Sequence, residues 1–127
     1  MITMQEQEIE EKVKQRYGRI ALTANSDCCC CSPEEKCGES GSPRQSATAV
    51  GYNIKDIDSI PESSILGVGC GAPTKFADIK QNEVVVDLGS GAGIDVFLAA
   101  NKVGKSGKLI GVDMTDEMLE KARKKCK

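Results

Sequence analysis

The residues most able to do chemistry are three closely spaced glycines with an aspartate on either side. Gly89, Gly91 and Gly93 follow Asp87 in the sequence DLGSGAG, directly after an apolar run. Glycines let the backbone turn tightly and approach a ligand, and a helix that starts here would offer free N–H groups. Asp113 ends a second apolar run, where a carboxylate can accept both hydroxyls of a ribose. The pattern predicts a site for a nucleotide-type cofactor.

The spacing of these glycines narrows the class of cofactor. Dinucleotide sites prefer G-x-G-x-x-G, whereas this chain has G-x-G-x-G. A carboxylate at Asp87 would repel a pyrophosphate, but it suits a cofactor that carries a cationic amino-acid group. DLGSGAG, followed by GVD at 111–113, resembles the first two motifs of class I S-adenosylmethionine methyltransferases. A nicotinamide or flavin site, or a glycine turn that binds nothing, fits these residues less well.

Seven cysteines and no histidine make up the second chemical feature. Cys70 lies between two glycines, where little side-chain bulk would shield it, although a lone cysteine is usually a small buried apolar residue. Four consecutive cysteines, 28–31, and Cys37 could hold a structural zinc ion or another thiophilic ion. The absence of histidine excludes an imidazole as base or metal ligand. Cys126 is expected in the core, on the apolar face of the last helix.

Composition and charge exclude several classes of protein. The chain has 127 residues, with 17 basic and 19 acidic side chains, a net charge of −2 and 3% aromatic residues. This balance gives no electrostatic basis for nucleic-acid binding. No apolar run approaches the ~18 residues of a membrane span, and the charged N-terminal residues lack an apolar signal segment. We therefore expect a cytoplasmic protein with reduced thiols, no nucleic-acid partner and no membrane association.

Hydrophobic patterning predicts an α/β fold with a strand–helix–strand unit near the end of the chain. Residues 84–88 and 109–112 are short apolar runs of the kind that form buried parallel strands. Residues 94–102 form an apolar helix between them. Thr115 is placed to cap a last helix.

The part of the chain before this unit divides in two. Residues 4–16 predict an amphipathic helix that Thr3 caps and that ends at Gly18. From residue 23 the composition shifts to serine, glycine, proline and cysteine, which is typical of a flexible loop. The predicted organisation is an N-terminal helix at 1–22, a cysteine-rich loop at 23–50, and the N-terminal part of a methyltransferase domain at 51–127.

The predicted sheet has few strands. Two parallel strands with their helices cannot cover both faces of a sheet. We therefore expect the chain to be the start of a Rossmann-like sheet in an incomplete form, or to be completed by a second polypeptide that supplies the missing half. Such a chain would show weak catalysis or none, and its exposed strand edge would favour self-association.

Longer matches extend the resemblance to one methyltransferase family. The sequence resembles the N-terminal half of the arsenite S-adenosylmethionine methyltransferases across nearly its whole length. The matching segments are VKQRYG at 13–18, the cysteine-rich segment from Ser26, IPESSILGVGCGAPT at 60–74, VVVDLGSGAGIDVFLAA at 84–100 and GKLIGVDMTDEMLEKAR at 107–123. DLGSGAG alone marks only the broad superfamily, whereas the G-C-G-x-P loop together with GVDMTDEM is much more specific.

The resemblance implies a function and roles for individual residues. The family methylates trivalent arsenic with S-adenosyl-L-methionine as the methyl donor. Cys70 would be one arsenic ligand, and Cys28 or Cys29 would be the second. Arsenite or its thiol conjugates would be the substrate, and a thiol reductant would be a partner. The cofactor would be held by Asp87, Gly89, Ser90, Gly91 and Gly93 around its methionine part, by Asp113 at its ribose and by Met114 at its adenine.

The chemistry that the resemblance implies suits these residue types. Trivalent arsenic bound by thiolates keeps a lone pair that can attack a sulfonium methyl group, so no general base is required. The protein then has to position the reactants and exclude water, and good alignment alone contributes ~7–11 kcal/mol. Two alternatives stay open. One is a methyltransferase of this fold that acts on a small organic acceptor, and the other is a non-catalytic thiol protein that sequesters soft metals or metalloids.

Overall fold

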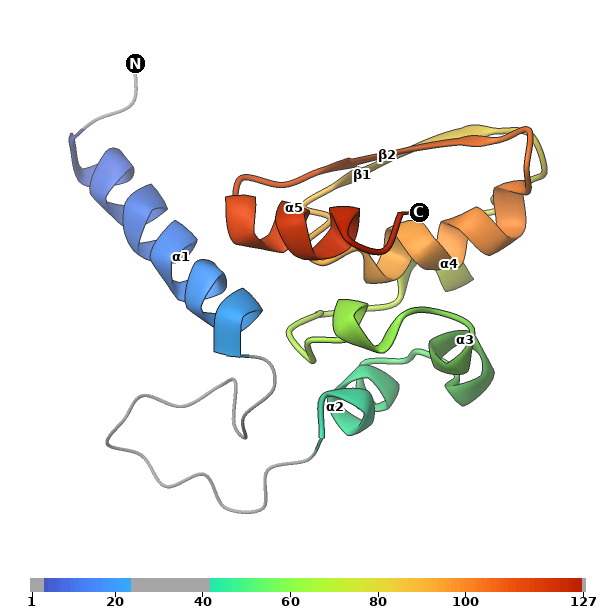
Figure 1. The fold of residues 1–127 in the computed structure, drawn as a ribbon, viewed down its shortest axis with the longest axis horizontal. Helices are drawn as coiled ribbons and strands as arrows, with labels where there is room; N and C mark the ends of the chain where they lie inside the picture. Colours follow the sequence, from blue (N-terminus) through green and yellow to red (C-terminus); the bar gives the residue numbers. More distant parts are fainter. Residues whose placement is uncertain (1–3, 24–41, 127) are drawn as a thin grey trace.

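The computed structural model describes residues 4–23 and 42–126 (Figure 1). The elements in chain order are α1 (Met4–Thr23), α2 (Pro43–Ala49), α3 (Ile54–Asp58), the 3₁₀ helices η1 (Glu62–Ser64) and η2 (Pro73–Lys75), β1 (Val84–Leu88), α4 (Ile94–Val103), β2 (Lys108–Val112) and α5 (Asp116–Arg123). None of the described helices combines the length and the apolar character that a membrane span requires.

The sheet consists of β1 and β2, which run parallel with α4 as the crossover between them. Val84 pairs with Lys108 at one end of the ladder, and Leu88 pairs with Val112 at the other. α4 contacts both strands and buries Val103 among other apolar side chains. The predicted α/β fold and its strand–helix–strand unit are confirmed, because each observed boundary lies within one residue of the expected one.

The face of the sheet that α4 does not cover is apolar and exposed. Val84 is 64% exposed and Val86 53%, and Figure 1 shows α4 on the opposite face. The sequence predicted strands buried on both faces, and this expectation differs from the structure. The reason is that none of the residues described by the structure covers this face.

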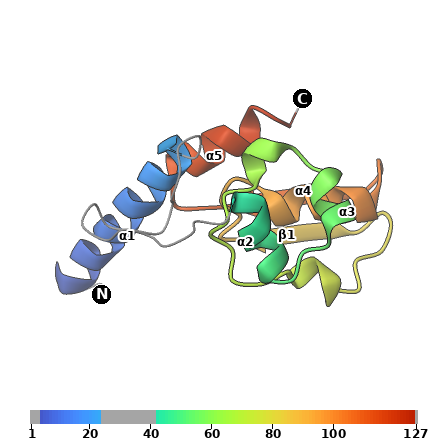
Figure 2. The ribbon, with the colours of Figure 1, turned by 90° about the horizontal axis from the view of Figure 1, so that it is seen from below.

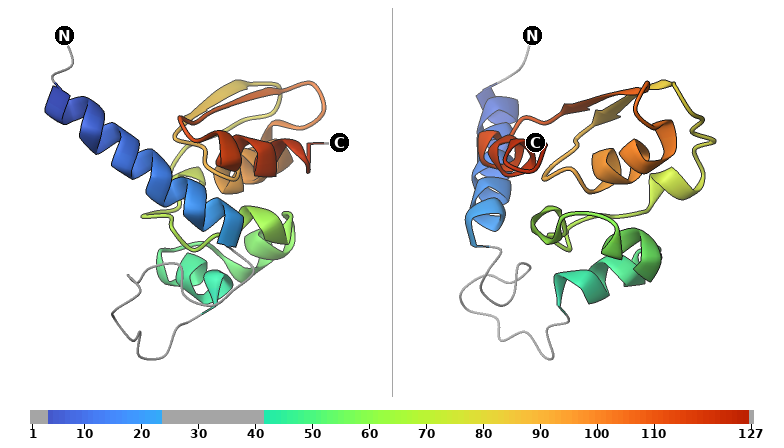
Figure 3. Two further views of the ribbon diagram at one scale, coloured as in Figure 1. Left: turned by 60° about the vertical axis from the view of Figure 1, so that its left-hand side comes forward. Right: turned by 45° about the vertical axis from the view of Figure 1, so that its right-hand side comes forward.

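α1 is longer than predicted because Gly18 serves helix packing and does not end the helix. Gly18 is buried, and a Cβ atom there would lie 3.1 Å from the carboxylate carbon of Glu117 in α5. The following turn of α1 brings Ile20 into an apolar cluster with Met118 of α5, and Figure 3 shows the two helices side by side. The prediction of a helix stop at Gly18 is therefore wrong, since the missing side chain lets the helices approach closely.

The last residues of the predicted cysteine-rich loop are helical. Pro43–Ala49 forms α2, which begins with a capping box made by Ser42 and Gln45. Gln45 N donates to Ser42 Oγ (3.3 Å), and Ser42 N donates to Gln45 Oε1 (2.8 Å). These residues differ from the predicted loop because a capping serine followed by proline favours the start of a helix. The predicted cap Thr3 and the cysteine cluster lie outside the described residues.

Two apolar clusters hold the elements together. One joins α2, α3 and the segment that follows them to α4, and the other joins α1 to α5 (Figure 2). The first contains Ala47, Tyr52, Ile57, Ile60, Ile65, Ala72 and Leu98, and the second contains Ile20, Ala21, Leu66, Ala92 and Met118. Residues 65–72, which include Cys70, contribute to both clusters. This segment is therefore fixed between the two halves of the described fold.

Cys126 belongs to neither cluster. It is exposed beyond the end of α5, where its sulfur donates a hydrogen bond to Ala122 O (3.4 Å). The prediction that Cys126 packs in the core is wrong, because α5 ends at Arg123 and the apolar face of the helix does not extend to this position.

Candidate functional site

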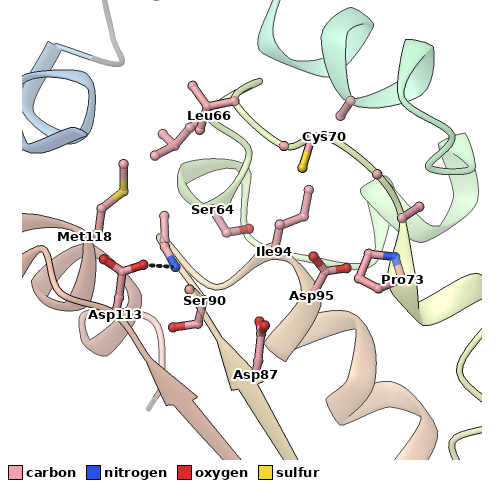
Figure 4. A pocket seen from close by; sticks show the side chains of 18 of the residues that line it. Ser64, Leu66, Cys70, Pro73, Asp87, Ser90, Ile94, Asp95, Asp113 and Met118 are labelled. Atoms are coloured by element: carbon pink, nitrogen blue, oxygen red, sulfur yellow. Dashed lines mark hydrogen bonds between the residues drawn. The ribbon is translucent and has the colours of Figure 1, made fainter. Parts of the chain in front are cut away.

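A pocket of about 870 Å³ opens at the carboxyl ends of β1 and β2 (Figure 4). Open parallel sheets bind ligands at this edge, outside the carboxyl ends of their strands. Most of the wall comes from three segments: residues 66–73, the glycine loop at 87–92, and residues 112–115. Tyr17 of α1 and Met118 of α5 also line the pocket. Segments that are distant in the sequence therefore share one cavity.

The glycine loop presents bare backbone to this pocket. Gly89 has a φ angle of 77° and Gly91 one of 53°, both in the left-handed region that favours glycine. A Cβ atom at Gly89 would meet nothing within 4 Å, and one at Gly91 would meet Met118 Sδ at 4.0 Å. The space beside the loop is therefore open to a ligand. Gly93, the third glycine of the pattern, is the N-cap of α4 and is buried.

Asp113 fastens the glycine loop to the end of β2. Its Oδ2 accepts a hydrogen bond from Gly91 N (2.8 Å; Figure 4), and its Oδ1 accepts one from Thr115 N (2.9 Å). Each carboxylate oxygen keeps a second lone pair that a ligand can use. The side chain thus organises the loop, and its contact with a ribose stays a prediction. Thr115 is the N-cap residue of α5, although its side chain makes no capping hydrogen bond.

Ser90 and Met114 contribute to the pocket in different ways. Ser90 is 7% exposed and packs over Gly111, where a Cβ atom would lie 2.9 Å from Ser90 Oγ. The Ser90 N–H donates to Val112 O (3.0 Å), so this residue fixes the loop against β2. Met114 also lines the pocket and is 44% exposed. Met114 therefore offers an accessible apolar surface, whereas Ser90 is chiefly a structural part of the wall.

Three carboxylates line the pocket, those of Asp87, Asp95 and Asp113, and its described lining includes no lysine or arginine. Burial raises the pKa of Asp87, and the charges of Asp95 and Asp113 raise it further. Burial also raises the pKa of Asp95, while a hydrogen bond from Tyr52 lowers it. Uncompensated negative charge of this kind favours a cationic group over an anion. The negative charge that suits a cationic cofactor group therefore comes from three side chains of the pocket and not from Asp87 alone.

Asp95 and Tyr52 are pocket residues that the sequence interpretation missed. Tyr52 Oη donates a hydrogen bond to Asp95 Oδ2 (2.8 Å) across a separation of 43 residues, and both side chains line the pocket. An aspartate in the first turn of the otherwise apolar helix IDVFLAANK was a usable signal for Asp95. No local pattern connects that aspartate with Tyr52, because the pair forms only when the chain folds.

Cys70 is exposed on the segment between η1 and η2 and lines the pocket. Figure 4 shows its sulfur pointing into the cavity, on the opposite wall from Asp113. The alternative that Cys70 is a buried packing residue is therefore wrong. The predicted partners Cys28 and Cys29 lie outside the described residues. Within the described part of the chain, no group of three or more potential ligands could hold a metal ion.

Comparisons with known proteins show what this chain is similar to. Residues 79–127 match the family model described as a methyltransferase domain. An arsenite methyltransferase of Halobacterium salinarum is 46% identical over 129 residues, an alignment that covers 92% of this chain and 31% of that protein. The chain is a relative of the arsenite methyltransferases. Its two parallel strands and crossover helix are the start of a class I methyltransferase sheet.

Two shorter matches relate this chain to further methyltransferases. An arsenite methyltransferase of Aquipseudomonas alcaligenes is 46% identical over 61 residues, which is 46% of this chain and 16% of that protein. Protein-L-isoaspartate O-methyltransferase 2 of Archaeoglobus fulgidus is 37% identical over 49 residues, which is 39% of this chain and 22% of that protein. The chain spans 31% or less of the length of these curated relatives. No solved structure matches the chain.

Proposed function

We propose that this chain carries the cofactor site of a methyltransferase that uses S-adenosyl-L-methionine to methylate trivalent arsenic bound by cysteine thiolates. The observation that carries the proposal is the position of Cys70, whose sulfur faces the same pocket as the glycine loop and the three carboxylates. The long match to a protein named arsenite methyltransferase supports arsenite as the substrate. Arsenic detoxification is the process that this activity would serve.

The pocket residues fit this cofactor. S-adenosylmethionine carries a sulfonium and an ammonium group, and the three carboxylates of the pocket are not neutralised by a lysine or arginine in its described lining. The open space beside Gly89 lets a ligand approach the backbone. Asp87 would hold the amino-acid end of the cofactor, Asp113 its ribose and Met114 its adenine. When bound, the cofactor supplies an electrophilic methyl group.

Cysteine thiolates would hold the arsenic. Soft thiolates bind thiophilic elements and must be deprotonated to do so. Cys70 would provide one thiolate at the pocket, and Cys28 or Cys29 would provide a second. Thiolate-bound trivalent arsenic keeps its own lone pair, so the chain needs no general base and its lack of histidine is no obstacle. A thiol reductant would keep these cysteines reduced, and the cytoplasm is the compartment that we predict.

The test replaces Cys70 and leaves the cofactor residues intact. We expect Cys70→Ser to abolish arsenite methylation, in this chain or in a longer protein that contains it, while the affinity for S-adenosylmethionine stays almost unchanged. Cys126→Ser is the matched control, because it removes an exposed thiol that does not line the pocket. Methylated arsenic is measured by mass spectrometry and cofactor affinity by calorimetry. Methylation by Cys70→Ser at the wild-type rate would show that Cys70 is not an arsenic ligand.

A small organic acceptor is the second candidate substrate. The match to a protein-L-isoaspartate O-methyltransferase supports an acceptor atom other than arsenic, but an organic acceptor leaves Cys70 in the pocket without a role. A methylation assay that compares arsenite with small organic acceptors separates the two. A non-catalytic thiol protein would instead bind arsenite without affinity for the cofactor, and Asp87→Ala or Asp113→Ala would leave that binding unchanged.

A further inference from the structure

The hydrogen bond between Tyr52 and Asp95 connects two walls of the pocket. The proposed function uses only the negative charge of Asp95, and it gives Tyr52 and this hydrogen bond no role. Tyr52 follows α2 and is 5% exposed, within the first apolar cluster. Asp95 lies in the first turn of α4, directly after the glycine loop. Tyr52 Oη donates to Asp95 Oδ2 over 2.8 Å. Tyr52 thus belongs to the segment that packs beside Cys70, and Asp95 belongs to the helix that follows the glycine loop.

The segment that carries Cys70 rests on the tyrosine. A Cβ atom at Gly69 would lie 3.8 Å from Tyr52 Oη and 3.9 Å from Tyr52 Cε2, so this glycine faces the hydroxyl end of the ring at close range. On the other side of Cys70, Ala72 is 4% exposed and packs in the same cluster as Tyr52. One side of the exposed cysteine therefore faces the Tyr52 ring, and the other side packs in the cluster that contains this ring.

Asp95 connects the same tyrosine to the glycine loop. It lies two residues after Gly93, which is the N-cap of α4 and the last glycine of the loop. Its Oδ1 is buried and has no hydrogen-bond partner in the described part of the chain, so the bond from Tyr52 is the one that satisfies this carboxylate. Leaving this half-buried carboxylate without any donor is costly. The hydrogen bond between Tyr52 and Asp95 therefore opposes separation of the two walls of the pocket.

We infer that Tyr52 and Asp95 are positioning residues that fix the Cys70 segment relative to the glycine loop, and thereby couple the thiol-bound substrate to the bound cofactor. The coupling of substrate to cofactor rests on the proposed function, whereas the connection between the two segments rests on the geometry alone. A displacement of about 1 Å between reacting groups can cost about 100-fold in rate. A contact that sets this distance is therefore important for activity even though it touches no reacting atom.

Four substitutions separate positioning from other roles. Tyr52→Phe removes the donor and keeps the ring in the core, and Asp95→Ala removes the acceptor. Asp95→Asn keeps an amide oxygen that can accept from Tyr52 Oη, so it should restore what Asp95→Ala loses. Tyr17→Phe is the matched control, because Tyr17 also lines the pocket but is 38% exposed. The double variant Tyr52→Phe/Asp95→Ala leaves no buried carboxylate unpaired, and it replaces Tyr52→Phe if that variant does not fold.

The first readout is amide hydrogen exchange in the ligand-free chain, in residues 68–72 and 94–97. We expect Tyr52→Phe and Asp95→Ala each to speed exchange in both segments by about 5- to 10-fold, because each removes the same link. The double variant should add little to either single change, as expected for partners in one contact. Asp95→Asn and Tyr17→Phe should resemble the wild type. Effects confined to one segment, additive effects, or an Asp95→Asn variant as loose as Asp95→Ala would overturn the inference.

The second readout depends on the cofactor and would not respond to a merely structural role. Saturating S-adenosylmethionine should slow alkylation of Cys70 in the wild type by about 5-fold, which corresponds to a coupling of about 1 kcal/mol. In Tyr52→Phe this protection should disappear while the cofactor still binds. Equal protection in both proteins, as simple shielding by the cofactor would give, would overturn the inference. If the wild type binds no S-adenosylmethionine, the proposed function fails, and hydrogen exchange still decides whether the link exists.

Discussion

At the scale of single residues, the carboxylates of the pocket have different roles: Asp113 is structural, whereas Asp87 contributes negative charge. Both oxygens of Asp113 already accept backbone N–H groups, so this residue shapes the glycine loop before any ligand arrives. Asp87 is half-buried next to Asp95 and Asp113, and its pKa is raised by burial and by both neighbours. The pocket thus combines a fixed loop with a charge that a cationic ligand can neutralise.

The raised pKa of Asp87 predicts that this residue destabilises the ligand-free protein. The native carboxyl group holds its proton more tightly than the unfolded one, so stability falls as the pH rises from the ordinary aspartate pKa through the raised native pKa. Above that window, Asp87→Asn should raise the melting temperature and weaken the binding of a cationic cofactor. Below the ordinary aspartate pKa, the two proteins should melt alike.

Thermal melts across the acidic to neutral range measure this effect. Asp78→Asn is the control, because the Asp78 side chain is 88% exposed and should show no comparable change. Equal melting temperatures of wild type and Asp87→Asn at neutral pH would contradict the burial of charge at this position.

Substitutions of Asp113 should lower the affinity for the cofactor in a graded way. Asp113→Ala removes the acceptor of the Gly91 N–H in the loop and that of the Thr115 N–H before α5. We expect the affinity for S-adenosylmethionine to fall about tenfold or more, since hydrogen bonds to charged groups contribute about 1.5–3 kcal/mol. Asp113→Asn keeps one acceptor oxygen and should lose less. Calorimetric titration measures the three dissociation constants. An Asp113→Ala variant that binds as tightly as the wild type would mean that the loop needs no such anchor.

At the scale of elements, the structure shows which features a local pattern can predict. The strands, the crossover helix and the glycine loop were predictable because apolar runs and glycine spacing are properties of neighbouring residues. The role of Gly18 depends on Glu117, and the role of Asp95 depends on Tyr52. The prediction for Cys126 failed because it assumed that the last helix reaches this residue, whereas α5 ends three residues earlier, at Arg123. These features depend on tertiary contacts, which a local pattern does not contain.

The contact between α1 and α5 gives a prediction for Lys121. Lys121 Nζ donates to Ala21 O (2.6 Å) near the C-terminal end of α1, where a cation is favourable. Lys121→Met should keep the packing of the side-chain stem but lower the free energy of unfolding by about 1 kcal/mol. Lys125→Met, at an exposed position after α5, is the control. Urea unfolding measures both, and an unchanged Lys121→Met midpoint would show that this contact does not anchor α1.

At the scale of the whole molecule, one face of the sheet is not covered by any of the described residues. Val84, Val86 and Ile110 expose apolar side chains there, whereas α4 covers the other face. The sequence predicted self-association for such a sheet, and this remains a prediction. If a second polypeptide completes the sheet, which is one of the two arrangements expected from the sequence, this face and its edge are the surfaces that it would cover.

Charged substitutions on this face test that surface. Because Val84 and Val86 are more than half exposed, Val84→Lys/Val86→Lys should change stability little and reduce self-association of the chain, since charges on exposed strands oppose pairing. Leu22→Lys is the control, because Leu22 is 74% exposed but lies on α1. Sedimentation velocity over a range of concentrations measures the effect. If the wild-type chain is monomeric, the face that carries Val84 and Val86 does not cause self-association.

The central claim is that Cys70 binds arsenic at the pocket that holds the cofactor, and an arsenite titration of the reduced chain tests it most directly. The wild type and Cys126→Ser should bind arsenite alike, and Cys70→Ser should bind it at least about tenfold more weakly, a difference of about 1.4 kcal/mol. All three should bind S-adenosylmethionine with the same affinity. If Cys70→Ser binds arsenite as tightly as the wild type, Cys70 is not the ligand and the proposed site is wrong.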